Sequence, residues 1–215
     1  MIPLPKAPWE SLSADFCGPL PSGDYIMVVK DDFSRYPEVE ILTTTSARAV
    51  IPKMDKIFVT HGIHSVVKTD NGPPFNSEHF AKFARYLGFK HKITRLWPEE
   101  NGETERFMRT LKKYLQTNSS GTWKQTLWQF LRSYRATPYS STGIPPATAV
   151  FGHNIRTQLP TIFTNIKSKV WRKMKENDEK YKQYQKTYAD KKRHTMKSYI
   201  KCGIFRFMIK NSYFV

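Results

Sequence analysis

Short apolar runs near the start of the chain predict three strands joined by tight turns. The runs lie at 11–17, 25–29 and 36–42, and the joins between them are rich in Gly, Pro, Asp and Ser. The second run is continuously apolar, which is typical of a strand buried on both faces. Because both joins are short, successive strands should pair antiparallel as a meander.

After the third strand, the apolar spacing changes from the period of strands to that of helices. It predicts helices over 46–61 and 77–87, each beginning at a serine that can cap it and followed by a glycine. Pro52 lies inside the first helix and should kink it or delay its start. Strands at 66–67 and 89–94 complete the pattern. Since a strand–helix–strand crossover makes a parallel pair, we expect an α/β fold with a mixed five-stranded sheet flanked by helices.

Two further amphipathic helices follow the predicted sheet. The first runs from about Asn101 to Thr117, with its apolar face formed by Phe107, Leu111, Tyr114 and Leu115. Its opposite face carries Glu105, Arg109, Lys112 and Gln116. The second helix has a similar apolar stripe, made of Trp123, Leu127, Phe130, Leu131 and Tyr134.

Charge divides the chain into a core and a basic tail. The 215 residues carry 35 Lys and Arg against 18 Asp and Glu, a net charge of +17, of which +11 falls on residues 161–215. Such an excess indicates a polyanionic partner, nucleic acid before an anionic membrane surface. We expect a compact domain over 8–160, a basic helical tail over 161–197 and a strand pattern over 198–215. Aromatic residues interleaved in the tail can form either a packing stripe or platforms for stacked bases.

Several classes of protein are excluded or disfavoured by composition. There is no run of 18 apolar residues, so no membrane span is expected, and no secretory signal is visible at the start. Cys17 and Cys202 are the only cysteines, which excludes a disulfide framework and a zinc site built on two cysteine pairs. The six histidines do not form a zinc set, and we expect surface or packing roles for them. A reducing intracellular setting is the default.

Three carboxylates stand out by their positions. Asp15 lies inside the first strand, where Asp is disfavoured, Asp70 ends the fourth strand, and Glu105 projects from the next helix. If the first and fourth strands are neighbours, Asp15 and Asp70 converge, and a helix crossing that edge could bring Glu105 to them. Convergent carboxylates repel one another unless cations hold them, and such oxygen ligands suit Mg²⁺ or Mn²⁺. Two such ions would clamp the attacking and leaving oxygens of a phosphoryl displacement.

Each of these acids also has an ordinary interpretation. Asp70 begins an Asp-Asn-Gly turn sequence, Glu105 can form a solvated ion pair one helical turn away, and Asp15 can be an edge-strand acid. Glu103 is the alternative to Glu105 as the third acid. The two acids at 31–32 follow a strand and are interpreted as solvated residues of a hairpin turn.

Four segments, in their order and spacing, are similar to one known family. They are 9–21, 28–38, 68–75 and 97–106, and they contain ADFCGPLP, VVKDDFSRYPE, KTDNGPPF and WPEENGETER. Through them, residues from about 8 to 160 resemble the catalytic core of integrases from retroviruses and Ty3/gypsy-type retrotransposons.

The resemblance implies a fold, a metal site and a reaction. The fold would be RNase H-like, and the family's triad of two aspartates and a glutamate falls on Asp15, Asp70 and Glu105 as catalytic residues and ligands of two Mg²⁺ or Mn²⁺ ions. The family processes element DNA ends and joins them to target DNA by transesterification. The expected partners are therefore DNA and further copies of the chain, without a membrane, and the expected location is the nucleus. The alternative is a decayed or co-opted integrase fragment that binds nucleic acid without catalysis.

Five residues near the expected site are candidates for DNA contact: Asn71, Asn101, Arg109, Lys112 and Lys113. The asparagines can position phosphate or water, but they also suit turns and helix starts. Arg109 and Lys112 share the face of Glu105, where they can contact a DNA backbone or remain solvated. Family members usually carry an N-terminal zinc domain, which is not expected here because the core begins almost at once. Residues 198–215 are interpreted as the truncated start of an SH3-like barrel.

Overall fold

The computed structural model describes residues 4–94, 98–117, 122–157 and 167–201, and one mixed sheet lies at its centre. Its strand order is β3-β2-β1-β4-β5. The strands are β1 (Ser11–Cys17), β2 (Tyr25–Asp31), β3 (Pro37–Leu42), β4 (Val66–Thr69) and β5 (Lys90–Ile93). The first three pair antiparallel, whereas β4 runs parallel to β1 and β5 runs parallel to β4. The expected mixed five-stranded sheet is confirmed.

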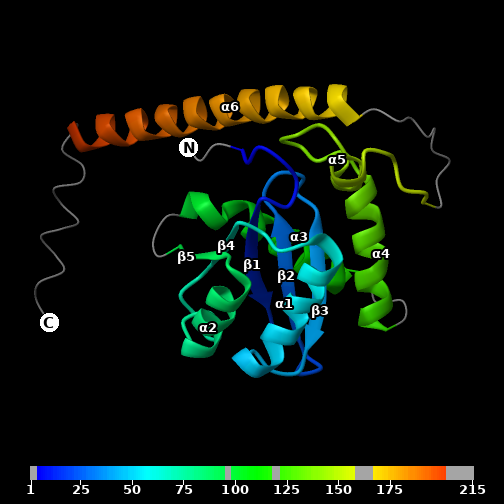
Figure 1. The fold of residues 1–215 in the computed structure, drawn as a ribbon. Coiled ribbons are helices and arrows are strands. Elements are labelled where there is room, and N and C mark those ends of the chain that lie inside the picture. The colour runs from blue at the N-terminus through cyan, green and yellow to red at the C-terminus, as the bar shows by residue number, and fades with distance from the viewer. Residues whose placement is uncertain (1–3, 95–97, 118–121, 158–166, 202–215) are drawn as a thin grey trace, which may run out of the picture.

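Helices cover both faces of this sheet. They are α1 (Ala47–His61), α2 (Glu78–Leu87), α3 (Pro98–Thr117), α4 (Trp123–Ala136), α5 (Pro146–Phe151) and α6 (Lys167–Lys201). Figure 1 shows α1 and α2 on one side of the sheet, α3 on the other, and α6 lying across one end. Within the described ranges, none of these helices is both long and apolar enough to span a bilayer.

The pleat of the strands separates two hydrophobic clusters. On β1, Leu12 and Ala14 belong to the cluster that packs beneath α1 and α2. Cys17 faces the opposite way and joins the cluster formed with α3 and α4. Because side chains alternate along a strand, Ser13 and Asp15 share the Cys17 face. The candidate acid on β1 therefore faces the helix that carries Glu105.

The start of α1 agrees with its prediction in position but not in side-chain capping. Ser46 occupies the N-cap position, but its side chain makes no capping hydrogen bond. Helix α1 begins at Ala47, and Pro52 lies inside it, so Pro52 does not delay the start. In contrast, Ser77 caps α2 as expected, since its hydroxyl accepts a hydrogen bond from the Phe80 backbone N–H at 3.2 Å.

The interpretation of residues 31–32 as solvated hairpin acids is wrong, because both side chains are buried. Asp31 organises the turn between β2 and β3. Its carboxylate accepts hydrogen bonds from the Ser34 hydroxyl and backbone N–H, at 2.5 Å and 2.9 Å, and from the Trp9 backbone N–H at 3.0 Å. Asp32 has different partners, described below. Polar groups of the chain thus replace the water that a solvated turn would bind.

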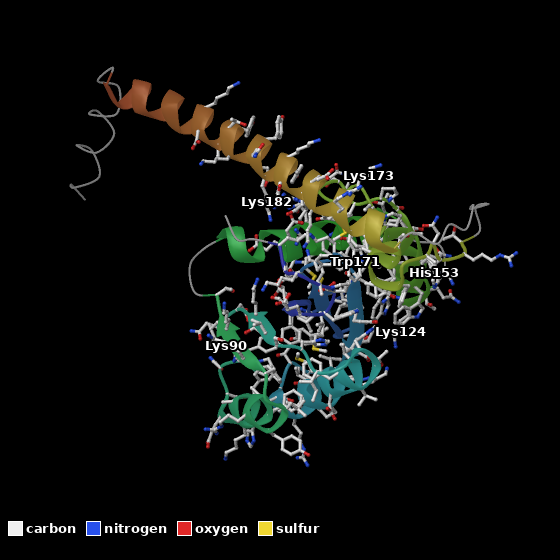
Figure 2. All side chains as sticks on the ribbon, turned by 45° about the horizontal axis from the view of Figure 1, so that its top comes forward. Lys90, Lys124, His153, Trp171, Lys173 and Lys182 are labelled. Atoms are coloured by element: carbon white, nitrogen blue, oxygen red, sulfur yellow. The ribbon has the colours of Figure 1, made fainter. Side chains whose placement is uncertain are left out.

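The first turns of α6 are packed onto the core. Met174 is fully buried, and Trp171 donates its indole N–H to the Ala149 carbonyl oxygen at 3.1 Å. Asp178, only 1% exposed, pairs with Arg35 at 3.1 Å. Figure 2 labels Trp171 near the start of α6, where this helix lies against the rest of the molecule. The helix predicted in the tail is present, and it continues to Lys201, so residues 198–201 are helical and do not start a strand. The boundary at 160 stays a prediction, and residues 202–215 of the expected barrel lie outside the described residues.

Candidate active site

The sheet register places Asp15 and Asp70 at matching points of neighbouring parallel strands. β1 pairs with β4 through Ser11 with Val66 and Ser13 with Lys68, an offset of 55 residues. The same offset leads from Asp15 to Asp70, which follows the last residue of β4. Both acids therefore lie at the carboxyl ends of adjacent strands, as the sequence predicted.

The pKa of Asp15 depends on the charges of the other two predicted acids. Burial of this half-buried side chain is the largest cause of a raised pKa, and the charges of Asp70 and Glu105 raise the pKa further. A hydrogen bond from the Phe16 backbone N–H, at 2.7 Å, and the charge of Lys112 act in the opposite direction. Like charges near a carboxylate disfavour its ionised form, so this pattern shows that the carboxylates share one neighbourhood.

The Asp70 carboxylate lies over the turn that follows β4. A Cβ atom built on Gly72 would stand 3.0 Å from Asp70 Oδ2, closer than most real contacts of this kind. A side chain at position 72 would therefore displace the carboxylate. The absence of a side chain at Gly72 thus leaves the Asp70 carboxylate in its present position, and a side chain there would shift it by a few tenths of an ångström.

Helix α3 presents Glu105 on its exposed face. Phe107, Met108 and Leu111 fix the opposite face by packing into the core, and all three are buried. Arg109, Lys112 and Lys113 are also exposed on this helix. Of these basic residues, Lys112 lies near enough to lower the pKa of Asp15 and also that of Cys17, which burial raises.

Glu103 has a different environment from Glu105. Its carboxylate accepts hydrogen bonds from the Tyr139 hydroxyl and, at 2.9 Å, from Arg106. Burial raises the pKa of Glu103, but the charges of Arg35, Lys30 and Arg106 and the Tyr139 hydrogen bond together outweigh burial and hold the pKa below its usual range. The two glutamates thus separate into one exposed acid and one acid embedded among cations.

The asparagine candidates are only partly located. Asn71 is exposed in the turn after β4, and its carbonyl oxygen accepts a hydrogen bond from the Asn76 side chain at 3.0 Å. Asn101 belongs to α3, but its side chain lies outside the described residues. The structure therefore places Asn71 beside Asp70 in sequence and in the same turn.

The donor set of Asp15, Asp70 and Glu105 suits a hard cation in kind, since carboxylate oxygens are the ligands that Mg²⁺ prefers. The charges of Asp70 and Glu105 acting on Asp15 also give a bound cation negative charge to neutralise. Among the side chains that the structure describes, however, no three His, Cys, Asp or Glu residues lie close enough together to hold a metal ion. The acids share a neighbourhood without forming a closed ligand cage.

Sequence reasoning missed a polar group directly behind the two aspartates. Asp32 accepts hydrogen bonds from Ser11 and Ser13 and pairs with Lys68. The available signal was spacing, because Ser13 and Lys68 each stand two residues before a candidate acid and so share its face of the sheet. The turn residue that joins them could not be found from spacing alone.

Comparison with known proteins agrees with this geometry. Residues 5–97 match the family model described as the integrase core domain. These residues are similar to that family. The chain resembles the integrase catalytic core of retroviruses and Ty3/gypsy-type retrotransposons, and the expectation drawn from its sequence motifs is confirmed.

Two relatives and one solved structure illustrate the similarity. The uncharacterized protein K02A2.6 of Caenorhabditis elegans is 38% identical over 161 residues, 73% of this chain and 13% of that protein. The transposon Tf2-3 polyprotein of Schizosaccharomyces pombe is 30% identical over 154 residues, 67% of this chain and 12% of the polyprotein. The HTLV-2 integrase catalytic core domain in complex with magnesium, in its trimeric form, matches with a TM-score of 0.57 at 18% identity.

These matches differ in what they establish. The HTLV-2 comparison covers 67% of this chain and 97% of that domain, and it confirms an RNase H-like integrase-core fold. The chain spans only about an eighth of the length of the two relatives. The similarity therefore covers only a domain-sized part of each of these two much longer relatives.

Proposed function

We propose that this chain is the catalytic core of a retroelement integrase, which processes element DNA ends and joins them to target DNA. The proposal is supported chiefly by the acids: Asp15 and Asp70 stand at matching positions on parallel strands, and the Glu105 charge acts on Asp15. In the proposed joining step, a 3′-hydroxyl of an element end forms a bond to a target phosphorus as the target's own P–O bond breaks. No covalent enzyme intermediate is needed.

Asp15, Asp70 and Glu105 would hold two Mg²⁺ or Mn²⁺ ions. When bound, the ions would supply charge stabilisation for the attacking and leaving oxygens of the phosphoryl transfer. The magnesium in the HTLV-2 core supports the choice of ion. The role of the chain is to present three carboxylates at the end of β1, the end of β4 and the exposed face of α3.

Exposed basic residues beside these acids would hold the DNA. Arg109, Lys112 and Lys113 on α3 would contact phosphates, and Asn71 and Asn101 would orient a phosphate or water. With DNA as its substrate, the proposed activity would take place in the nucleus. The trimeric form of the HTLV-2 core supports self-association of this chain, with oligomer size to be measured in solution.

The first test is a Mn²⁺ titration of the wild-type chain, Asp15→Asn and Asp70→Asn. We expect each aspartate variant to lose at least one binding site while remaining folded. Equal binding by the wild-type chain and both variants would contradict the metal triad. A folded chain that binds DNA but no Mn²⁺ would favour the alternative, a co-opted integrase fragment without catalysis.

The second test is Mn²⁺-dependent nicking and joining of a short duplex by Glu105→Gln. The change keeps the size of an exposed helical side chain, so folding and DNA binding should be nearly unchanged while joining is lost. Glu78→Gln, an exposed glutamate at the start of α2, is the matched control. Glu103→Gln should not serve as a neutral control, because Glu103 is tied to Tyr139 and Arg106. Joining that survives in Glu105→Gln would show that another acid completes the site.

A further inference from the structure

Asp32 connects the two strands that carry the candidate aspartates. Its carboxylate accepts hydrogen bonds from the hydroxyls of Ser11 and Ser13 on β1, at 2.7 Å and 2.6 Å. The same carboxylate pairs with the ammonium group of Lys68 on β4 at 2.9 Å. In addition, the Asp32 backbone N–H donates to the Ser11 carbonyl oxygen at 2.9 Å. One residue of the β2–β3 turn is thereby bonded to both strands.

This connection lies immediately behind the candidate site. The ladder between β1 and β4 ends with the pair Ser13 and Lys68, two residues before Asp15 and Asp70. Because side chains alternate along strands, all four project from the same face of the sheet. Asp32 therefore bonds to Ser13 and Lys68, whose side chains lie next to those of the two aspartates on the same face of the sheet.

The environment of Asp32 is rich in cations and shielded from solvent. Asp32 as a whole residue is only 8% exposed. The side chains of the pair are shielded to a similar degree, since that of Lys68 is 12% exposed and that of Asp32 is 11% exposed. Lys30 is fully buried and lies opposite Ser13 in the ladder between β1 and β2. It is near enough to Asp32 for the negative charge of that residue to raise the Lys30 pKa. Screening by water is weak in such a place, so a charge left unpaired there would act strongly on its neighbours.

We infer that Asp32 is a positioning residue for the proposed metal site: it fixes β1 against β4 and cancels the Lys68 charge behind Asp15 and Asp70. This inference rests on the proposed function, because it assigns a purpose to the charge balance behind the carboxylates. If Lys68 were unpaired, its ammonium group would repel a cation bound by the two aspartates. If Asp32 were unpaired, its carboxylate would attract that cation.

The test is Mn²⁺ binding, measured from the electron paramagnetic resonance signal of the free ion, by four proteins. They are the wild-type chain, Asp32→Asn, Lys68→Gln and the double variant. We expect Asp32→Asn to bind Mn²⁺ about tenfold more weakly, the order expected for one uncancelled unit charge near a partly shielded site. Lys68→Gln should bind several-fold more tightly, and the double variant should bind like the wild-type chain.

This pattern of signs separates positioning by charge from simple damage to the fold. Damage would make the double variant bind no better than Asp32→Asn, and would make Lys68→Gln bind more weakly than the wild-type chain. Either result would overturn the charge cancellation between Asp32 and Lys68. Because Lys68→Gln tests the same balance, the inference stays decidable if Asp32→Asn does not fold. Asp55→Asn, an exposed acid on α1, is the control for loss of one negative charge.

A measurement without metal tests the structural half of the inference. In Asp32→Asn, amide hydrogen exchange should accelerate at Val66–Thr69 more than in the helix α1, because Lys68 loses its partner across the strand pair. Equal acceleration everywhere, or none, would overturn the role of Asp32 in joining the strands. A wild-type chain that binds no Mn²⁺ would refute the proposed metal site, while the exchange comparison would still decide whether Asp32 joins β1 to β4.

Discussion

Lys30 gives the sharpest prediction about the stability of this fold. It lies on β2, its side chain is fully buried, and its ammonium nitrogen has no hydrogen-bond partner among the described residues. Burial is the main cause that lowers its pKa to about 7, and the charges of Arg35 and Arg106 lower it as well. Glu103 and Asp32 oppose this shift without cancelling it. A charged Lys30 is therefore a cost to the folded chain.

The sign of the pH dependence follows from proton counting. Between pH 7 and the ordinary lysine pKa of about 10.4, Lys30 is neutral in the folded chain and protonated in the unfolded chain. The unfolded state then binds more protons, so the contribution of Lys30 to the free energy of unfolding rises with pH. The rise is about 1.4 kcal/mol per pH unit at full difference, or about 2 kcal/mol between pH 7 and pH 9.

The perturbation is Lys30→Met, which keeps the length of the side chain and removes its charge. We expect this variant to be more stable than the wild-type chain at pH 7, with an advantage that shrinks by about 2 kcal/mol by pH 9. The assay is urea unfolding at several pH values with unchanged slopes, and Lys90→Met at an exposed position on β5 provides the baseline. A difference between Lys30→Met and wild type that does not vary with pH would refute the reasoning.

Two further predictions concern α6. Asp178→Asn should lower the free energy of unfolding by about 3 kcal/mol, because the buried Arg35 would lose its ion-pair partner. A change near zero in urea unfolding would mean that α6 is not held by this pair. Exposed lysines of the same helix should supply phosphate contacts. Changing four of them to Gln should therefore reduce the slope of log K for DNA binding against log salt concentration by about 3 to 4. An unchanged slope would show that the DNA-binding surface lies elsewhere. The four are Lys173, Lys175, Lys180 and Lys186.

The sheet and the position of two acids could be predicted because they depend on local patterns. Short apolar runs separated by turn residues define β1, β2 and β3. The crossover through α1 makes β4 parallel to β3, and therefore also parallel to β1. Once β1 and β4 are adjacent, the place of Asp15 beside Asp70 follows from register. The adjacency of β1 and β4 is only assumed at that point, because periodicity and handedness do not by themselves fix the order of the strands in a sheet.

The polar groups behind the site could not be predicted in the same way. An Asp-Asp pair after a strand is typical of a solvated turn, and only the three-dimensional fold brings Asp32 onto Ser11 and Lys68. Pro52 shows a similar limit, since it was expected to kink α1 or delay its start, and the helix nevertheless begins at Ala47. Packing of Val50, Met54 and Phe58 into the core outweighs the unfavourable local preference.

The tail shows where a correct periodicity stops being informative. Its aromatic and apolar residues recur at helical spacing, yet Met174 is buried whereas Tyr184 is 68% exposed and Tyr188 is 63% exposed. The same stripe thus begins as a packing surface and continues as an open one. Spacing alone could not tell where contact with the core ends, because that depends on which residues of the core lie beneath the helix.

The two parts of the proposed site are held by different interactions. Asp15 and Asp70 depend on the β1–β4 ladder and on Asp32, whereas Glu105 depends on the packing of α3 through Phe107 and Leu111. A link between α6 and α3 passes through Arg35, which pairs with Asp178 and whose charge acts on Glu103, two residues before Glu105. Changes in α6 should therefore act on the glutamate side of the site, whereas changes at Asp32 should act on the aspartate side.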